Sequence, residues 1–353
     1  MGINMNNKIP ILAIVGPTAS SKTALSLELA EKFNAEIISG DSMQVYKTLN
    51  IATAKPSLDE LSKIRHHMID IIEPSQNFNV QDYVTQAAEV ISDVHERGKL
   101  PLVVGGTGLY IDSLLQNIAF SKAGIDEKLR EELFARDKQD LYNELVTIDP
   151  IYAKKLHPNN VKRIVRSLEM YKLTGITPTE QAAQSKTIKS PYDVFMIGLD
   201  FRSREKLYQR INLRVDKMFE QGLVEEAKMV YNINSKEFAQ NENILQNTTT
   251  LQENTAFQAK IACHRNTAFQ AKIACCRNTF FQAIGYKEFE LYFKGMDTLE
   301  NVIENIKQNT RNYAKRQLTW FRRNKNTNWL YVDDYDNYDL LVKKTIEMCK
   351  GNF

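Results

Sequence analysis

Ile11-Leu-Ala-Ile-Val-Gly-Pro-Thr-Ala-Ser-Ser-Lys-Thr23 is the stretch that decides the fold of this chain. Five apolar residues run into a glycine and a short turn, after which a helical pattern continues to Phe33. The order strand, loop, helix is typical of a phosphate-binding loop, in which backbone N–H groups surround an anion. Lys22 adds a positive charge, and the Thr23 hydroxyl can bind a divalent metal. We predict that this loop binds a di- or triphosphate through Gly16, Pro17, Thr18, Ala19, Ser20, Ser21, Lys22 and Thr23.

Ser21 departs from the usual pattern, in which a glycine precedes the lysine so that the backbone can approach phosphate closely. A serine can hold a conformation that favours glycine, but at some cost in strain. An ordinary strand-to-helix turn is the alternative interpretation. Because Gly16, Lys22 and Thr23 have the expected spacing, we favour phosphate binding and leave open how far Ser21 weakens it.

The composition is that of an ordinary soluble protein with one or two domains: 353 residues, 43% hydrophobic and 25% charged. No apolar run is long enough to span a bilayer, and residues 1–10 lack the apolar core of a signal peptide. The cysteines lack the paired spacing of a structural zinc site. We therefore expect a cytoplasmic, monomeric protein that does not bind a membrane.

Basic residues gather in two stretches, although the net charge is only +3. Six lie between Arg311 and Lys325 without any acidic residue, and six lie between Lys154 and Lys172 against Glu169 alone. Two such stretches in a nearly neutral protein indicate a polyanionic partner. Two solvated helix faces are the alternative.

Aromatic residues are interleaved with the second basic stretch, on a helix predicted for residues 299–323. Tyr313, Trp320 and Phe321 offer flat faces to bases while the basic side chains offer charge to phosphates, a combination that suits RNA better than a membrane surface. The alternative is that Trp320 and Phe321 belong to the core, which we expect for Phe321.

Strands that end in glycine or aspartate recur along the first third of the chain. Residues 35–39 end at Gly40 and Asp41, residues 67–72 are a third strand candidate, and residues 100–104 run into a Gly-rich turn around Thr107. Ligands of an open α/β sheet bind at the carboxyl ends of its strands, so Asp41 and Thr107 should share a crevice with the phosphate loop. Asp41 could hold magnesium, take a proton or merely cap a helix.

These patterns predict an α/β fold, a P-loop NTPase-like parallel sheet core with an inserted helical domain and a helical C-terminal region. Residues 8–122 form the first part of the core, 123–185 the helical insertion, and 190–231 with 280–350 complete the core and add the C-terminal helices. Near-identical twelve-residue units repeat within the remaining range, 232–279, which indicates duplication. We expect that insertion to be poorly ordered or marginally helical and to carry no chemistry.

Arg210 and Arg214 lie four residues apart in a helix predicted for residues 202–221, and therefore on one face. Two arginines on one face can clamp an anion, or they can be surface charges.

Taken together, these segments resemble the tRNA dimethylallyltransferases, enzymes that put an isopentenyl group on the adenosine next to the anticodon. The resemblance extends over nearly the whole chain, apart from the repeat and the two termini. The segments that carry it are 16–23, 41–46, 105–110, 156–166, 282–288 and 313–322.

The resemblance implies that the phosphate loop holds the diphosphate of dimethylallyl diphosphate and not that of ATP. It also implies that Asp41 is the general base for the exocyclic amine of adenine, which is a poor nucleophile. The charge of the leaving diphosphate would be neutralised by Mg²⁺ at Thr23 and by Lys22, Thr107, Arg210 and Arg214.

On the RNA side the resemblance implies that the anticodon stem-loop of a tRNA is bound with its target base flipped out. The positions that match the family's tRNA contacts are Asp41, Ser42, Met43, Gln44, Arg130, Lys162, Arg163, Arg166, Gln282, Gly285, Tyr286, Lys287, Lys315, Arg316, Gln317, Trp320 and Arg322.

Three other functions remain open from the residues alone. A small-molecule kinase or NTPase would use the phosphate loop equally well but leaves the helix around Trp320 without a role. An adenylate isopentenyltransferase acting on free nucleotides would not need that helix either. A non-catalytic RNA-binding protein would keep the helix and treat Ser21 as a mark of lost catalysis.

Overall fold

The structure, a computed structural model, describes residues 8–118, 124, 126–187, 189–248 and 280–353. The chain divides into two compact units, which are described separately. One unit contains a sheet and comes from residues 1–116, 190–234 and 278–353; the helices of the other come mainly from 117–189.

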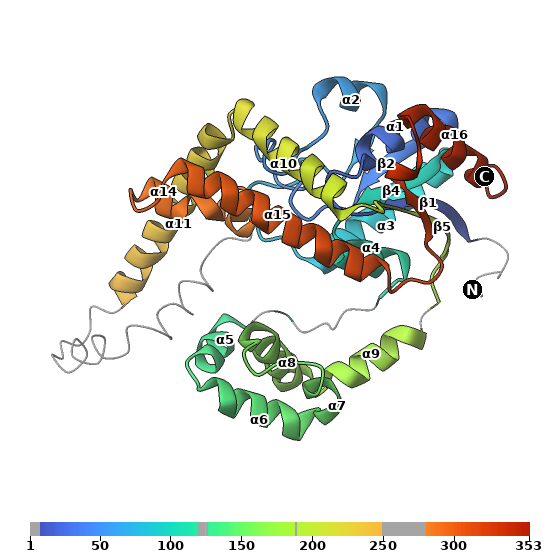
Figure 1. The fold of residues 1–353 in the computed structure, drawn as a ribbon. Helices are drawn as coiled ribbons and strands as arrows, with labels where there is room; N and C mark the ends of the chain where they lie inside the picture. The colour runs from blue at the N-terminus through green and yellow to red at the C-terminus, as the bar shows by residue number, and fades with distance from the viewer. Residues whose placement is uncertain (1–7, 119–123, 125, 188, 249–279) are drawn as a thin grey trace. The chain divides into compact units, whose positions relative to one another are not determined.

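A six-stranded parallel sheet with the order β3-β2-β4-β1-β5-β6 organises the first unit (Figure 1). Its central strand β1 consists of apolar residues buried on both faces, as expected in a parallel sheet covered by helices. The carboxyl ends of the strands therefore meet at one edge. The strands are β1 Ile9–Val15, β2 Ala35–Ser39, β3 His66–His67, β4 Leu100–Gly105, β5 Tyr192–Asp200 and β6 Asn328–Tyr331.

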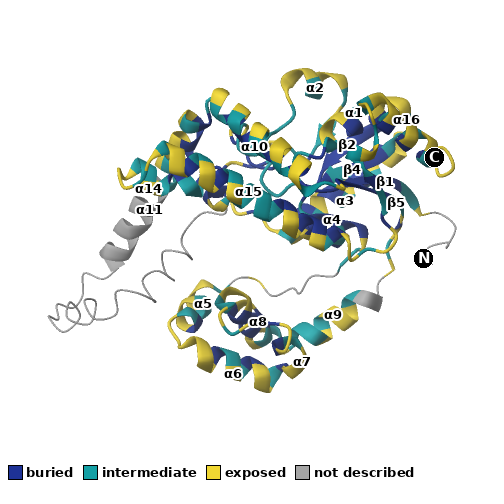
Figure 2. Cartoon of the chain, viewed as in Figure 1, coloured by how far each residue is buried: buried dark blue, intermediate teal, exposed yellow. Residues whose placement is uncertain are grey.

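Alternate residues of β1 enter two hydrophobic clusters, one on each face of the sheet. Ile11 and Val15 pack with residues of α3, α4, α10 and α15, whereas Leu12 and Ile14 pack with α1 and α16. Figure 2 shows the buried residues concentrated along the strands and the inner sides of these helices. The helices of this unit are α1 Lys22–Lys32, α2 Leu58–Lys63, α3 Val80–Glu96, α4 Gly108–Leu115, α10 Arg204–Glu220, α14 Glu290–Phe293, α15 Leu299–Phe321 and α16 Tyr338–Cys349, with 3-10 turns at Phe280–Gln282, Lys287–Phe289 and Val332–Asp334.

The α/β fold predicted from the sequence is thus confirmed, but one strand was predicted to be longer than it is. The predicted strand 67–72 is wrong beyond His67, because β3 pairs with β2 only through residues 66–67. Ile72 instead forms an isolated parallel bridge with Tyr46. Met68 and Asp70 have positive φ angles of 63° and 54°, which take the chain out of the extended conformation.

The second unit is helical and has its own hydrophobic cluster around Leu141, Leu145 and Leu168. Buried Asp149 organises it, because its carboxylate accepts hydrogen bonds from the backbone of Tyr152 and from both the N–H and the hydroxyl of Thr179. Its helices are α5 Glu127–Phe134, α6 Lys138–Ile148, α7 Pro150–Ala153, α8 Val161–Thr174 and α9 Pro178–Thr187.

Helix α11, Leu223–Thr248, leaves the sheet-containing unit and continues into the range predicted to be an insertion. The repeat itself falls within residues 249–279, outside the described residues, apart from the partial copy that resumes at Phe280. Among the described helices none is long and apolar enough to cross a membrane.

Candidate functional site

The loop between β1 and α1 wraps around its own backbone carbonyl at Pro17. The Ser20 hydroxyl donates to that oxygen over 2.8 Å and the Lys22 ammonium over 2.6 Å. Gly16 begins the loop with a φ of 149°, and a Cβ there would lie 2.6 Å from the carbonyl oxygen of Leu199 on β5. Only glycine fits that close approach, so this part of the motif is required by packing as well as by conformation.

Ser21 adopts the left-handed conformation that glycine favours, with φ 67° and ψ 21°, at the N-terminus of α1. Its hydroxyl accepts a hydrogen bond of 2.8 Å from the Arg210 guanidinium, which also donates to the Ala19 carbonyl over 2.9 Å. The serine therefore carries strain that a glycine would avoid, and it ties the loop to α10. Arg210, expected to clamp an anion, here holds the loop.

Gln317 joins α15 to both glycine-containing loops. Its carbonyl oxygen accepts from the backbone N–H of Thr18 over 3.0 Å, and its amide donates to the Gly106 carbonyl over 2.9 Å. The side chain is only 5% exposed. The amide of Gln317, expected to contact tRNA, is thus engaged inside the protein, where it fixes the phosphate loop.

Asp41 lies just beyond β2, where the chain passes closely beside the end of β4. A Cβ on Gly105 would lie 2.4 Å from the Gly40 carbonyl oxygen, so the two strand ends can approach each other only without a side chain there. The Asp41 carboxylate accepts from the Met43 backbone over 2.8 Å. Beside it, the Thr107 hydroxyl accepts from the Ser42 backbone N–H over 3.1 Å.

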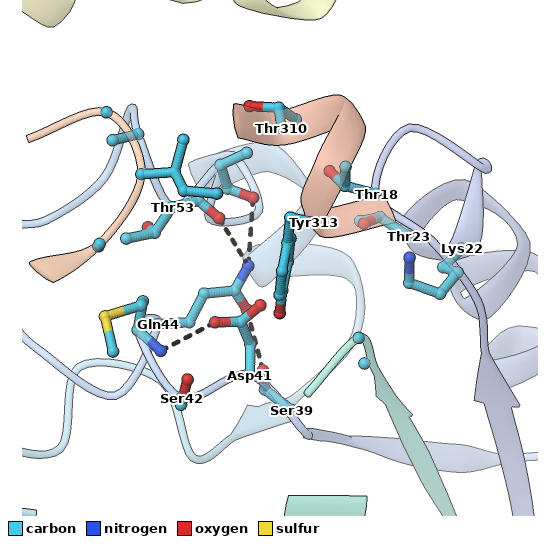
Figure 3. A pocket seen from close by; sticks show the side chains of 18 of the residues that line it. Thr18, Lys22, Thr23, Ser39, Asp41, Ser42, Gln44, Thr53, Thr310 and Tyr313 are labelled. Atoms are coloured by element: carbon cyan, nitrogen blue, oxygen red, sulfur yellow. Dashed lines mark hydrogen bonds between the residues drawn. The ribbon is translucent and has the colours of Figure 1, made fainter. Parts of the chain in front are cut away.

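The phosphate loop, Asp41 and the end of α15 surround one cavity of about 410 Å³ (Figure 3). The Tyr313 ring extends from α15 toward Asp41, and its hydroxyl lies near Thr107 and Gln317. The cavity is lined by, among others, Thr18, Lys22, Thr23, Ser39, Asp41, Ser42, Met43, Gln44, Ala52, Thr53, Ala54, Gly106, Arg214, Met218, Gln282, Gly285, Lys287, Ile306, Thr310, Tyr313, Arg316 and Gln317.

Burial dominates the electrostatics of this cavity. Desolvation, followed by the charge of Arg214, lowers the pKa of Lys22 to about 7, although Asp41 acts in the opposite direction. Desolvation likewise lowers the pKa of Arg214. Two poorly solvated cations against one carboxylate leave an unbalanced positive charge, which a bound anion would stabilise.

Desolvation raises the pKa of Asp41, opposed by hydrogen bonds from the backbone of Met43 and Gln44 and by the charges of Lys22 and Arg214. A carboxylate whose pKa is raised is a better proton acceptor than an exposed one, provided that it is ionised at the working pH. The arrangement therefore provides a base and an anion site in the same cavity.

The predicted tRNA contacts occupy several different settings in the described part of the chain. Ser42, Met43, Gln44, Gln282, Gly285, Lys287 and Arg316 line the cavity with Asp41 and Gln317, whereas Tyr286 is fully buried. Lys315 is exposed on α15.

Trp320 and Arg322, at the end of α15, make contacts within the protein. The Trp320 indole donates to Asp112 over 2.6 Å, and Arg323 lies 3.9 Å above its ring. A Cβ at Gly108 would lie 2.2 Å from the same ring, so Trp320 fixes α15 against α4. Arg322 donates to buried Asp200 over 2.6 Å.

The helical unit presents the other basic positions. Arg130 and Arg166 both donate to the fully buried carboxylate of Glu169, over 3.0 Å and 2.7 Å. Lys162 and Arg163 are exposed on the first turn of α8. In the sequence Glu169 stands out only as the one acidic residue of this basic stretch. In the structure it orients Arg130 and Arg166.

Comparisons with known proteins show which family this chain is similar to. A family model described as IPP transferase matches residues 44–324. The tRNA dimethylallyltransferase of a Thermoanaerobacter species is 42% identical over 348 residues, covering 97% of this chain and 98% of that protein. That of Halalkalibacterium halodurans is 42% identical over 93% of each chain.

Two solved structures are also similar. The full-length tRNA isopentenylpyrophosphate transferase from Bacillus halodurans is 39% identical with a TM-score of 0.65, covering 98% of this chain and 97% of that one. A eukaryotic dimethylallyltransferase described as acting on tRNA is 33% identical with a TM-score of 0.70, covering 92% of this chain and 74% of that one.

Proposed function

The chain belongs to the IPP transferase family. We propose that it transfers the dimethylallyl group of dimethylallyl diphosphate to a tRNA. The acceptor is the N6 amine of the adenosine on the 3′ side of the anticodon, at position 37. The observation that carries the proposal is that Asp41 shares one cavity with the cations Lys22 and Arg214. An amine can displace diphosphate only if the base and the diphosphate site lie in the same cavity.

In the proposed reaction the N6 lone pair attacks C1 of the dimethylallyl group. The N6–C1 bond forms while the C1–O bond to diphosphate breaks, and Asp41 takes the proton that N6 loses. Lys22 exchanges its contact with the Pro17 carbonyl for a diphosphate oxygen, and Arg214 neutralises charge beside it. Thr107, whose hydroxyl accepts from the Ser42 N–H beside Asp41, would guide the amine or the leaving group.

Magnesium is part of the proposal. The described residues contain no group of three or more His, Cys, Asp or Glu placed to hold a metal. Mg²⁺ in phosphate sites is commonly held by one or two protein oxygens and by the substrate's own phosphates, and the Thr23 hydroxyl in the cavity fits that pattern. When bound there, the ion would neutralise charge on the leaving diphosphate.

In the sheet-containing unit the proposed tRNA contacts include Gln282, Lys287 and Arg316, which line the cavity. In the helical unit they are the basic positions Arg130, Lys162, Arg163 and Arg166. Lys315 extends the positive charge along α15. Contacts of this kind to phosphates would position the anticodon loop, and the base flipped into the cavity would meet Asp41.

Transfer of labelled dimethylallyl diphosphate onto a tRNA with adenosine 3′ of its anticodon, in the presence of magnesium, tests the function. We expect the label on the tRNA with the parent protein and a loss on the order of 10²- to 10⁴-fold with Asp41→Ala, because the general base is removed. Asp59→Ala, at an exposed position of α2, is the matched control. Transfer by Asp41→Ala at the parent rate would contradict the role of Asp41, and nucleotide hydrolysis independent of tRNA would favour a kinase or NTPase.

A further inference from the structure

A buried carboxylate outside the cavity, that of Glu226 on α11, binds two segments of the cavity wall. One oxygen accepts from the backbone N–H groups of Asn50 and Ile51, each over 2.8 Å. The other accepts from the N–H of Ala52 over 3.0 Å and from the Tyr286 hydroxyl over 2.8 Å. The side chain is 9% exposed, so four donors converge on a carboxylate that is largely removed from water.

Both segments that Glu226 binds belong to the cavity wall. Ala52, Thr53 and Ala54 line it from one segment, and residues 282–285 line it from the other. The two segments also touch directly, because a Cβ on Gly285 would lie 2.7 Å from the Cβ of Ala52. Gly285 has a φ of 101°, so this position requires glycine for its conformation as well as for its packing against Ala52.

The first segment in turn holds a residue close to the base. The Gln44 amide donates to the carbonyls of Thr53 and Ala54, over 3.2 Å each, while its own oxygen accepts from the Ser39 hydroxyl over 2.9 Å. Gln44 lies three residues after Asp41, on the same turn. Two sets of hydrogen bonds, joined through the backbone of residues 50–54, therefore link Glu226 to the turn that carries Asp41.

Stability alone does not require an acid here. Apolar packing already holds both segments, since Phe280, Phe281 and Phe289 beside one and Leu49 beside the other are fully buried in the main cluster. Burying a carboxylate is unfavourable unless hydrogen bonds compensate for lost hydration, and here four do. A carboxylate is suited to this task because both of its oxygens only accept.

We propose that Glu226 is a positioning residue for tRNA, which sets the wall of the cavity that receives the target base by fixing residues 50–54 against 282–286. The inference rests on the proposed function. It gives Tyr286, expected to contact tRNA, the role of linking the second segment to Glu226. The diphosphate end of the cavity, formed by Thr18, Lys22 and Arg214, is held by other contacts, so its affinity should not depend on Glu226.

Two substitutions separate the parts of this arrangement. Glu226→Gln replaces one accepting oxygen by an amino group that faces N–H donors, and should loosen both segments. Tyr286→Phe removes one donor and leaves the three backbone contacts in place, so it should release only the second segment. Glu225→Gln, exposed on the same helix, and Tyr292→Phe, whose ring packs on Phe289, are the matched controls.

Steady-state kinetics with each substrate varied in turn is the first measurement. We expect Glu226→Gln to raise KM for tRNA about tenfold and Tyr286→Phe to raise it less, because hydrogen bonds to a charged group are among the stronger ones in proteins. KM for dimethylallyl diphosphate should stay within about twofold of the parent value, since that end of the cavity makes no contact with Glu226. Equal rises in both KM values, or a fall in melting temperature without any change in KM, would overturn the proposal.

Amide hydrogen exchange provides a test that does not depend on activity. Glu226→Gln should speed exchange at residues 50–52 and in the peptide containing 283–286, and Tyr286→Phe only in the latter. If the parent transfers nothing, the proposed function fails, whereas this exchange pattern together with weaker tRNA binding by Glu226→Gln would still support the positioning role. Unchanged exchange at residues 50–52 in Glu226→Gln would refute it.

Discussion

Ser21 offers a quantitative test, because strain and a hydrogen bond act on it in opposite directions. A non-glycine residue in the left-handed conformation, here φ 67° and ψ 21°, costs about 1 kcal/mol. The hydrogen bond from the exposed Arg210 guanidinium returns about 0.5 to 1 kcal/mol. Ser21→Gly removes both effects and should leave the free energy of unfolding nearly unchanged. Ser21→Ala keeps the strain and loses the bond, so it should be the less stable variant by about 1 kcal/mol.

Thermal unfolding of the parent, the glycine variant and the alanine variant measures this difference. In a chain of this size about 1 kcal/mol corresponds to a melting temperature lower by about 2 °C for Ser21→Ala. The Michaelis constant for dimethylallyl diphosphate should also rise a few-fold in Ser21→Ala, because Arg210 then holds the loop only through its bond to the Ala19 carbonyl. Equal melting temperatures for the glycine and alanine variants would refute the claim that residue 21 is strained.

Three further predictions concern the site and the insertion. Asp41 must be ionised and Lys22 protonated, so kcat/KM for the diphosphate should fall as pH drops through the raised pKa of Asp41 and also as pH rises above about 7. Lys22→Arg should move the alkaline limb of this pH profile to higher pH. An alkaline limb that stays in place would exclude Lys22 as its source. Gln317→Leu leaves the Thr18 N–H and the Gly106 carbonyl without their partner, so it should lower the free energy of unfolding by about 1–3 kcal/mol and raise KM for the diphosphate. Gln308→Leu, on the exposed side of α15, should change neither quantity. Deleting residues 254–277 should leave transfer unchanged or improved, and a large loss of activity would contradict a passive role for the repeat.

The parts of the fold that the sequence predicted are those that depend on local pattern. An apolar run, a glycine and a helix with Lys22 at its start are contiguous, so β1, the loop and α1 could be recognised without any tertiary information. Parallel strands then bring their carboxyl ends together, and for that reason Asp41 and Thr107 could be placed near the loop before a structure was at hand. The strand predicted beyond His67 failed because residues at positive φ interrupt an apolar run that looked extended.

The parts that escaped prediction depend on partners far away in the chain. Gln317 bonds to Thr18 from 299 residues away, and Glu226 reaches Asn50 from 176 residues away. No periodicity or motif relates such positions, and an acid on an amphipathic helix is normally a surface charge. The only signal for Glu226 in the sequence is its position on the face of α11 that also carries Leu223 and Val230.

Contacts with distant parts of the chain also change the interpretation of the basic stretch at the end of α15. Counting charges predicted that the end of α15 faces RNA, and that role stays a prediction. In the structure Arg322 donates to Asp200, and Trp320 donates to Asp112 with Arg323 above its ring. Arg322 binds the helix to the end of β5 and Trp320 binds it to α4, and the helix in turn carries Tyr313 and Gln317 into the cavity. Substitutions at Trp320 and Arg322 should therefore act on the site through the placement of α15. Loss of a direct phosphate contact would weaken tRNA binding most at low salt, would make that binding less dependent on salt, and would spare binding of the diphosphate. A displaced helix should instead weaken the binding of both substrates at every salt concentration.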